Sequence, residues 1–305
     1  MATARTVLID PEIALPYHLV SRCVRRAWLC GWDRITRKDY THRKVQLEQR
    51  LLRLVEAFAV DLYAYAIMSN HFHLVVFHDP KAYLEWSDEE VAERWVRAYA
   101  PEPVLEDAYR RACMKAAILT EPHRLDYRRR RLGSLSVFMQ HLKQPIARDA
   151  NREDAVKGHF FDQRFYSGAL LDDDALLAAM AYVDLNPVRA RIAKDIESCQ
   201  HTAIARRLQH HTAHRLDGFL QPIASGLEKA PRPSISLRCY IARLQALIEI
   251  TRQHPHQQKQ PAAPDKRWMQ HIATLSRPQR AFGAKDALEA WIEARQLRAV
   301  ETPLA

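Results

Sequence analysis

The chain has 305 residues, of which 48% are hydrophobic, and a formal net charge of +10. This length and hydrophobic content suffice for one large domain, or for a domain with an appended second one, and argue against general disorder. Because 46 lysine and arginine residues outnumber 36 acidic ones, a polyanion such as nucleic acid is a natural class of partner, although many basic proteins bind none.

Cysteine and glycine usage excludes several classes of site. The cysteines are scattered without CxxC spacing, which argues against a disulfide framework and a thiolate zinc site. With only 7 glycines and no GxxxxGK or GxGxxG pattern, a glycine-rich phosphate loop is not expected. No stretch approaches the roughly 18 apolar residues of a membrane span, and the N-terminus has no apolar signal core. We therefore expect a cytoplasmic protein that does not contact membrane.

The first quarter of the chain predicts the order strand, helix, strand, strand. Residues 16–29 alternate apolar and polar side chains after a proline, as a strand does. Leucines recur at helical spacing within residues 41–59, which predicts an amphipathic helix. The runs VDLYAYAIM and HFHLVVFH are joined by Ser69 and Asn70, the signal of a β-hairpin.

Residues 79–132 interrupt this rhythm and predict an insertion with two helices, SDEEVAERWVRAY and LEDAYRRACMKAAIL. The insertion ends in the basic run HRLDYRRRRL, in which Tyr127 lies among five arginines. One interpretation is that these arginines contact DNA phosphates, with Tyr127 stacking on a base; the other is a solvated basic loop. We expect DNA contact from Arg124, Arg128, Arg129, Arg130 and Arg131.

Three further segments complete the first 195 residues. Apolar residues from Leu135 to Ile146 predict an amphipathic helix, kinked at Pro145. Residues 158–171 are typical of extended structure or a strand pair. Residues 172–187 form a helix whose start is capped by aspartates and whose end near Asn186 is enforced by a proline.

The remainder, residues 196–305, is predicted to be an accessory region that holds or selects DNA. Helices are expected over residues 236–253 and 284–296. Between them, near residues 254–264, lies a linker rich in proline, glutamine and histidine.

The pair His71 and His73 is the first candidate for chemistry. Residues two apart in a strand share a face, so the two imidazoles project side by side while Phe72 points to the opposite face. Such a pair can hold one divalent ion if another element supplies a further ligand. An isolated HxH is nevertheless more often a pair of core histidines, and we expect structural or peripheral roles for His18 and His159.

The helix at residues 172–187 offers partners for that pair. Tyr182 and Asn186 lie four residues apart and therefore share one helical face. Asn186 offers an amide oxygen as a hard ligand, and Tyr182 a phenolic oxygen that can act as a nucleophile. Taken singly, each is more simply explained as a core tyrosine and a helix-terminal residue.

Taken together, MSNHFHLVV, GHFFDQRFYSGALL and YVDLNPVRARI resemble the single-tyrosine HUH transposases, and most closely their REP-associated tyrosine transposase branch. The resemblance spans about residues 12–195. It implies an α+β fold, a ferredoxin-like sandwich with a central antiparallel sheet. Ser69 departs from the proline that the family usually has two residues before the first histidine.

The resemblance also implies roles for individual residues. His71, His73 and Asn186 match the ligands of a Mg²⁺ or Mn²⁺ ion, and Tyr182 matches the nucleophile. The implied reaction nicks single-stranded, hairpin-bearing DNA and transfers the strand through a 5′-phosphotyrosine. Arg164 and Arg189 flank the site and are expected to contact DNA. The segment 79–132 and the region after 195 exceed the family core.

Several alternatives stay open at this stage. The chain could be a domesticated hairpin-DNA-binding protein without transposition activity, which would not need the four-residue set. A rolling-circle initiator or relaxase is disfavoured by the order of the motifs, and a metal-dependent hydrolase would leave Tyr182 without a task. Tyr166 is a rival nucleophile without an asparagine one turn away. Members of the families that the chain resembles act as monomers or homodimers, so either state is possible here. In both cases we expect the protein to associate with the nucleoid.

Overall fold

The computed structural model describes residues 5–24, 30–33, 37–162, 164–209, 218–227, 233, 235–252, 263–295, 297 and 303. It is an α+β structure built on one six-stranded, mostly antiparallel sheet with the order β7-β4-β5-β1-β6-β8. The bounds of these strands in chain order are Leu15–Arg22 (β1), Val60–Ile67 (β4), His71–His78 (β5), Tyr166–Leu170 (β6), Ala224–Ser225 (β7) and Ala281–Phe282 (β8). Trp32–Asp33 (β2) and Lys38–Asp39 (β3) form a separate two-stranded sheet.

The hairpin of β4 and β5 lies at the centre of the sheet. Ser69 and Asn70 form its turn, which the amide of Met68 closes by donating to the carbonyl of His71 at 2.8 Å. Strand β1 runs antiparallel on the other side of β5, with Val20 opposite His73 and Arg22 opposite His71. This confirms the predicted hairpin and the first strand, whose predicted residues 25–29 lie outside the described part of the chain.

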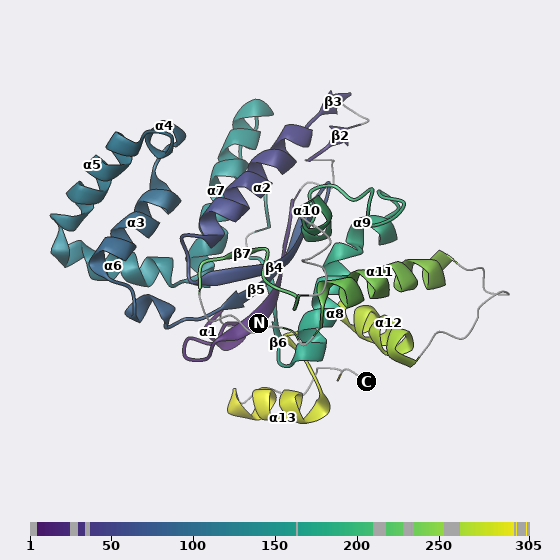
Figure 1. Ribbon diagram of the computed structural model, residues 1–305. Helices are drawn as coiled ribbons and strands as arrows, with labels where there is room; N and C mark the ends of the chain where they lie inside the picture. The colour runs from purple at the N-terminus through teal and green to yellow at the C-terminus, as the bar shows by residue number, and fades with distance from the viewer. Residues whose placement is uncertain are drawn as a thin grey trace.

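Helices cover both faces of the sheet (Figure 1). On one face, α2 (Thr41–Val55) packs along α7 (Leu135–Glu153), and Pro145 lies inside α7. Buried Arg43 of α2 fastens the pair by donating to Glu153 and Asp154 near the end of α7. On the other face lies α8 (Asp173–Asp184), followed by the short α9 (Asn186–Arg189).

The predicted insertion is helical and forms a lobe beside the sheet, at the far left in Figure 1. It comprises η1 (Ala82–Leu84), α3 (Asp88–Tyr99), α4 (Glu102–Leu105), α5 (Ala108–Leu119) and α6 (Pro122–Leu132). Both predicted helices are confirmed, with Ser87 and Asp107 as their N-caps. The basic run is the helix α6 and not a loop.

The C-terminal region shares the sheet and core of the first 195 residues. Strand β7 extends the sheet beside β4, and β8 extends it at the opposite edge beside β6. Gly226 follows β7 where a Cβ atom would lie 2.2 Å from the carbonyl oxygen of Val55, so only glycine permits this approach. The helices of this region are α10 (Ala203–Gln209), α11 (Leu237–Arg252), α12 (Ala263–Leu275) and α13 (Lys285–Ala294), besides the short N-terminal α1 (Arg5–Leu8).

Residues 175–181 of α8 are all buried, as their unbroken run of apolar side chains requires. The sheet covers one side, and α12 packs against α8 from another (Figure 1). None of the helices in the described part of the chain is long and apolar enough to cross a membrane.

Candidate active site

His71 and His73 project from β5 toward α8. Their ring centroids lie 4.8 Å apart at an interplanar angle of 82°. Phe72, between them, points to the opposite face and packs against the ring of Phe161 at 5.9 Å. The strand period therefore places the two imidazoles side by side, His73 buried and His71 partly exposed.

The end of α8 and the start of α9 bring Tyr182 and Asn186 to the same place. The ring of Tyr182 lies 5.6 Å from that of His73 and is half-buried. The side-chain amide of Asn186 lies 3.3 Å from Nε2 of His73. At the other end of the helix, the Asp172 carboxylate accepts from the amide of Ala175 at 2.8 Å, which confirms the predicted acidic cap.

His18 of β1 is a further member of the site. Its Nε2 lies 3.0 Å from Nδ1 of His73, and the two rings stack at 5.3 Å with an interplanar angle of 16°. It also contacts the Tyr182 ring, edge to face, at 5.6 Å. The sequence predicts only a structural or peripheral role for His18, because it does not reveal the register that sets β1 beside β5.

The site favours neutral imidazoles. Burial lowers the pKa of His18 and of His71 to about 4, with the charge of Arg22 contributing at His71. The pKa of His73 is lowered well below its ordinary value by burial, by the neighbouring histidines, and by Arg22 and Arg189. A neutral imidazole keeps a lone pair for a ligand. The charged neighbours that act on His71 and His73 are cationic, so the surroundings attract anions.

The donor set fits a divalent ion, although none of the described residues form a cluster of three His, Cys, Asp or Glu side chains suited to a metal. Nδ1 of His71 lies 2.7 Å from the side-chain oxygen of Asn70, and with that oxygen as the acceptor Nδ1 carries the proton and Nε2 keeps its lone pair. Nε2 of His73 faces the Asn186 amide. Rotating that amide by 180° would present its oxygen beside the imidazole nitrogens, and the two orientations are equivalent in shape. Two nitrogens and one oxygen of this kind form an open ligand set.

The rival nucleophile Tyr166 has a different environment. Its hydroxyl donates to the carbonyl of Gln279 and accepts from the amide of the same residue at 3.2 Å. Its ring still contacts His18 at 5.9 Å. The C-terminal region thus engages the Tyr166 oxygen, whereas Tyr182 stands beside both His73 and Asn186.

The arginines predicted to contact DNA fall into two groups. Arg189 joins the candidate site, with its guanidinium carbon 4.9 Å from the centroid of the Tyr182 ring. Arg164 is exposed in the segment before β6.

The remaining arginines lie on α6, in the lobe on the opposite side of the molecule in Figure 1. Arg128 is buried and donates to the carbonyl of Ile118 and to Glu121. Arg129 donates to Asp88 at 2.6 Å and to the carbonyl of Trp86. Both guanidinium groups therefore hold the lobe together. The other three have side-chain partners as well: Arg124 with Glu121, Arg130 with Asp126, and Arg131 with Tyr99. DNA contact by α6 stays a prediction.

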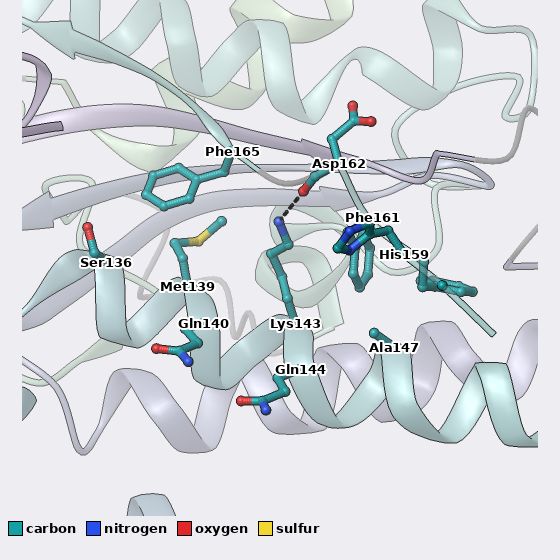
Figure 2. A pocket seen from close by; sticks show the side chains of 12 residues that line it. Ser136, Met139, Gln140, Lys143, Gln144, Ala147, His159, Phe161, Asp162 and Phe165 are labelled. Atoms are coloured by element: carbon teal, nitrogen blue, oxygen red, sulfur yellow. Dashed lines mark hydrogen bonds between the residues drawn. The ribbon is translucent and has the colours of Figure 1, made fainter. Parts of the chain in front are cut away.

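A separate hollow lies on the α7 face of the sheet (Figure 2). Lys143 reaches across it and donates to the carbonyl of Asp162 at 3.0 Å, with its ammonium 5.4 Å from the centroid of the Phe161 ring. Because Phe161 packs on Phe72, this hollow belongs to the face turned away from His71 and His73.

Comparisons with known proteins give one structural likeness. No protein-family model and no curated protein matches the chain. Among solved structures, a REP-associated tyrosine transposase bound to a REP hairpin is similar, with a TM-score of 0.40 and 11% sequence identity over 76% of this chain and 100% of that one. Values this low do not establish a family for this chain.

Proposed function

We propose that the protein nicks single-stranded DNA and rejoins strands through a covalent bond to Tyr182. The observation that carries this proposal is the convergence of His71, His73, Asn186 and Tyr182 on one face of the sheet. Chance burial explains each residue singly but gives no reason for an imidazole pair, an amide and a phenol to meet. The motif resemblance supports hairpin-bearing DNA as the substrate.

The order of the elements supports a ferredoxin-like fold for this core. The chain runs β1, α2, β4, β5, α7, β6, and the strands lie in the order β4-β5-β1-β6. That is the strand–helix–strand–strand–helix–strand pattern in which two split units interleave. One chain supplies all four site residues, so we propose that a monomer suffices to form the site.

The residues would hold the substrate as follows. His71, His73 and the amide oxygen of Asn186 would hold Mg²⁺ or Mn²⁺, which when bound polarises a non-bridging phosphate oxygen. Arg189 lies over the Tyr182 ring and can pair with the same phosphodiester. Holding phosphate and phenol together supplies much of the rate, because positioning replaces a bimolecular encounter.

The covalent step uses Tyr182 as the nucleophile. Its oxygen forms a bond to phosphorus while the bond from phosphorus to the 3′ oxygen breaks. The phenol loses its proton and the departing 3′ oxygen gains one, which leaves a 5′-phosphotyrosine and a free 3′-hydroxyl. Attack by another 3′-hydroxyl reverses the step and rejoins strands without ATP.

The test is a covalent adduct. Wild-type protein incubated with a labelled single-stranded hairpin and Mn²⁺ should give a protein–DNA species that survives denaturation, attached through the 5′ side. Tyr182→Phe removes one oxygen and little volume, so the adduct should vanish while folding and DNA affinity persist. Tyr166→Phe is the matched control and should retain the adduct.

Three results would contradict the proposal. An adduct that maps to Tyr166 would move the nucleophile. Cleavage without any adduct would indicate a nuclease that uses water. Hairpin binding with no cleavage at all would favour a domesticated DNA-binding protein.

A further inference from the structure

A groove with a basic rim and an apolar floor lies beside the candidate active site. We call it the basic groove. It has a volume of about 870 Å³ and lies between the turn of residues 187–194, α11 and α12 (Figure 1). Leu247 and Ile272 are buried in its floor, and Met269 is half-buried. A floor of this kind holds a flat apolar surface.

The rim is cationic. Arg189, Arg191, Lys194 and Arg252 line it, and its lining contains no carboxylate. Arg252 is neutralised in part by Glu249 at 3.1 Å. Within the described part of the chain, no salt bridge joins Arg189, Arg191 or Lys194 to a carboxylate, although the charge of Lys194 acts on Asp195 next to it, and all three cations are exposed. Exposed cations around an apolar floor match a ligand that carries both negative charge and apolar rings.

Arg189 connects the groove to the active site, because it lines the groove and also lies over the ring of Tyr182. A strand whose scissile phosphate lies at Tyr182 would therefore continue into the groove. We propose that the basic groove binds the single-stranded DNA that flanks the scissile phosphate, with phosphates at Arg191 and Lys194 and a base on the floor. This inference rests on the proposed function, and its test measures binding and not cleavage.

Single-stranded DNA fits this groove better than an acidic peptide does. Consecutive phosphates can pair with several of the cations that line the groove, and each nucleotide also offers an unpaired base to the floor. An acidic peptide would bring charge without a flat ring at regular spacing. Competition between the two ligands separates them.

The binding experiment uses a fluorescent oligothymidylate, which forms no hairpin, and measures anisotropy as a function of salt. The double variant Arg191→Ala/Lys194→Ala should weaken binding roughly 10-fold at moderate salt and reduce the salt slope by about 1.4, since each phosphate contact on a single strand contributes about 0.7. Arg110→Ala/Lys285→Ala is the matched control. It removes equal charge from exposed positions on α5 and α13, outside the groove, and should bind like wild type.

A second variant tests the groove without removing a cation. Ala273 is exposed on α12 and lines the groove, so Ala273→Glu adds a carboxylate there without disturbing the core. It should weaken oligothymidylate binding, because the added carboxylate repels the phosphates of the strand. If Arg110→Ala/Lys285→Ala weakened binding as much as the groove variants do, only the overall charge of the protein would matter, and the proposal would fail. Unchanged oligothymidylate binding in both groove variants would also overturn it. The proposal would also be overturned if polyglutamate displaced the fluorescent oligothymidylate at concentrations where unlabelled oligothymidylate does not. Failure of the proposed function is recognised separately, by the absence of a Tyr182 adduct.

Discussion

His73 makes more of the site's contacts than any other single residue described above. Its Nδ1 faces His18 and its Nε2 faces Asn186, so a different partner holds each nitrogen of one ring. If Nε2 is to bind a cation, Nδ1 must carry the proton and donate to His18. His18 then carries its own proton on Nδ1, a buried atom without a partner among the described residues. Its packing between Tyr166 and Tyr182 fixes the ring in place.

His18 should therefore act as a positioning residue for His73. We expect His18→Ala to lower Mn²⁺ affinity by roughly 10- to 100-fold, the usual effect of losing the partner that orients a ligating histidine. His18→Asn, whose amide oxygen can accept from Nδ1 of His73, should recover part of that affinity. Isothermal titration calorimetry with Mn²⁺ measures both without any DNA.

The control for this prediction is His78→Asn, at the far end of β5 from His71 and His73. His78 is also buried, and its Nε2 contacts the carbonyl of Gly133 at 2.9 Å, away from the site. The His78→Asn variant should have a lower free energy of unfolding and an unchanged Mn²⁺ affinity. Equal affinity losses in the His18 and His78 variants would show that only stability was measured.

Helix α8 carries chemistry on one side and an anchor on the other. While Tyr182 faces His73, Asp184 is fully buried beneath the C-terminal region. One carboxylate oxygen of Asp184 accepts from the amide of Ile204 at 3.0 Å, and the other accepts from the hydroxyl of Tyr240 at 2.7 Å. A single side chain therefore holds α10 and α11 to the helix of the proposed nucleophile.

This anchor predicts a pH dependence. Burial raises the pKa of Asp184 from its ordinary 3.8 to about 6, so folding favours the neutral acid. The stabilisation is fully present below pH about 4 and is lost as pH rises through 6. Asp184→Asn cannot ionise, so wild type should lose up to about 3 kcal/mol of unfolding free energy relative to the variant between pH 4 and pH 7. Urea denaturation of both proteins across this range measures the difference.

Asp195→Asn is the matched control with the opposite sign. The Ser198 hydroxyl and backbone amide, by hydrogen bonding, lower the pKa of the partly exposed Asp195 carboxyl. Wild type should therefore gain stability relative to Asp195→Asn as pH rises through the acid range. A stability difference for Asp184→Asn that does not change between pH 4 and pH 7 would mean that its burial does not penalise the charge.

On the scale of the whole molecule, the C-terminal region supplies the strand at each edge of the sheet. Strand β8 pairs in parallel with β6, and Phe282 is fully buried opposite Leu170. The cap residue Asp172 of α8 also accepts from the amide of Ala284 at 2.7 Å. The start of α8 and the end of the chain therefore support each other.

This arrangement makes strand β8 part of the folded core. Phe282→Ala should lower the unfolding free energy by about 3–4 kcal/mol, the usual result of emptying a buried aromatic site. Lys285→Ala, at a position whose side chain is 77% exposed, should change it by less than about 0.5 kcal/mol. Urea midpoints compare the two, and an equally small effect of both would show that β8 adds nothing to the core. Deletion of residues 254–305 would remove this core contribution as well as any DNA contact.

Much of the site was predictable because its key pairs are local in sequence. The strand period places His71 and His73 on one face, and the helix repeat does the same for Tyr182 and Asn186. Short-range sequence signals also predicted the hairpin, the acidic cap and both helices of the insertion. The part played by His18 did not, because strand register depends on contacts between distant residues.

The basic run of α6 is a case where a local sequence signal did not reveal what the side chains contact. Its sequence indicated a polyanion ligand, but carboxylates elsewhere in the chain and backbone carbonyls of the lobe engage Arg128 and Arg129. Charge in a sequence does not reveal which charges meet after folding. The basic groove was hidden for the same reason, since residues 185–194 line it together with parts of α11 and α12 that follow more than fifty residues later.

By itself, the sequence determined the period of each element, and with it which side chains share a face. It therefore specified an α+β chain with two pairs of reactive residues. Only the tertiary structure decided that the two pairs meet, that β1 sets His18 against His73, and that the C-terminal region completes the sheet. The physical reason is that periodicity is fixed by local backbone geometry, whereas register and packing depend on burial summed over the whole chain.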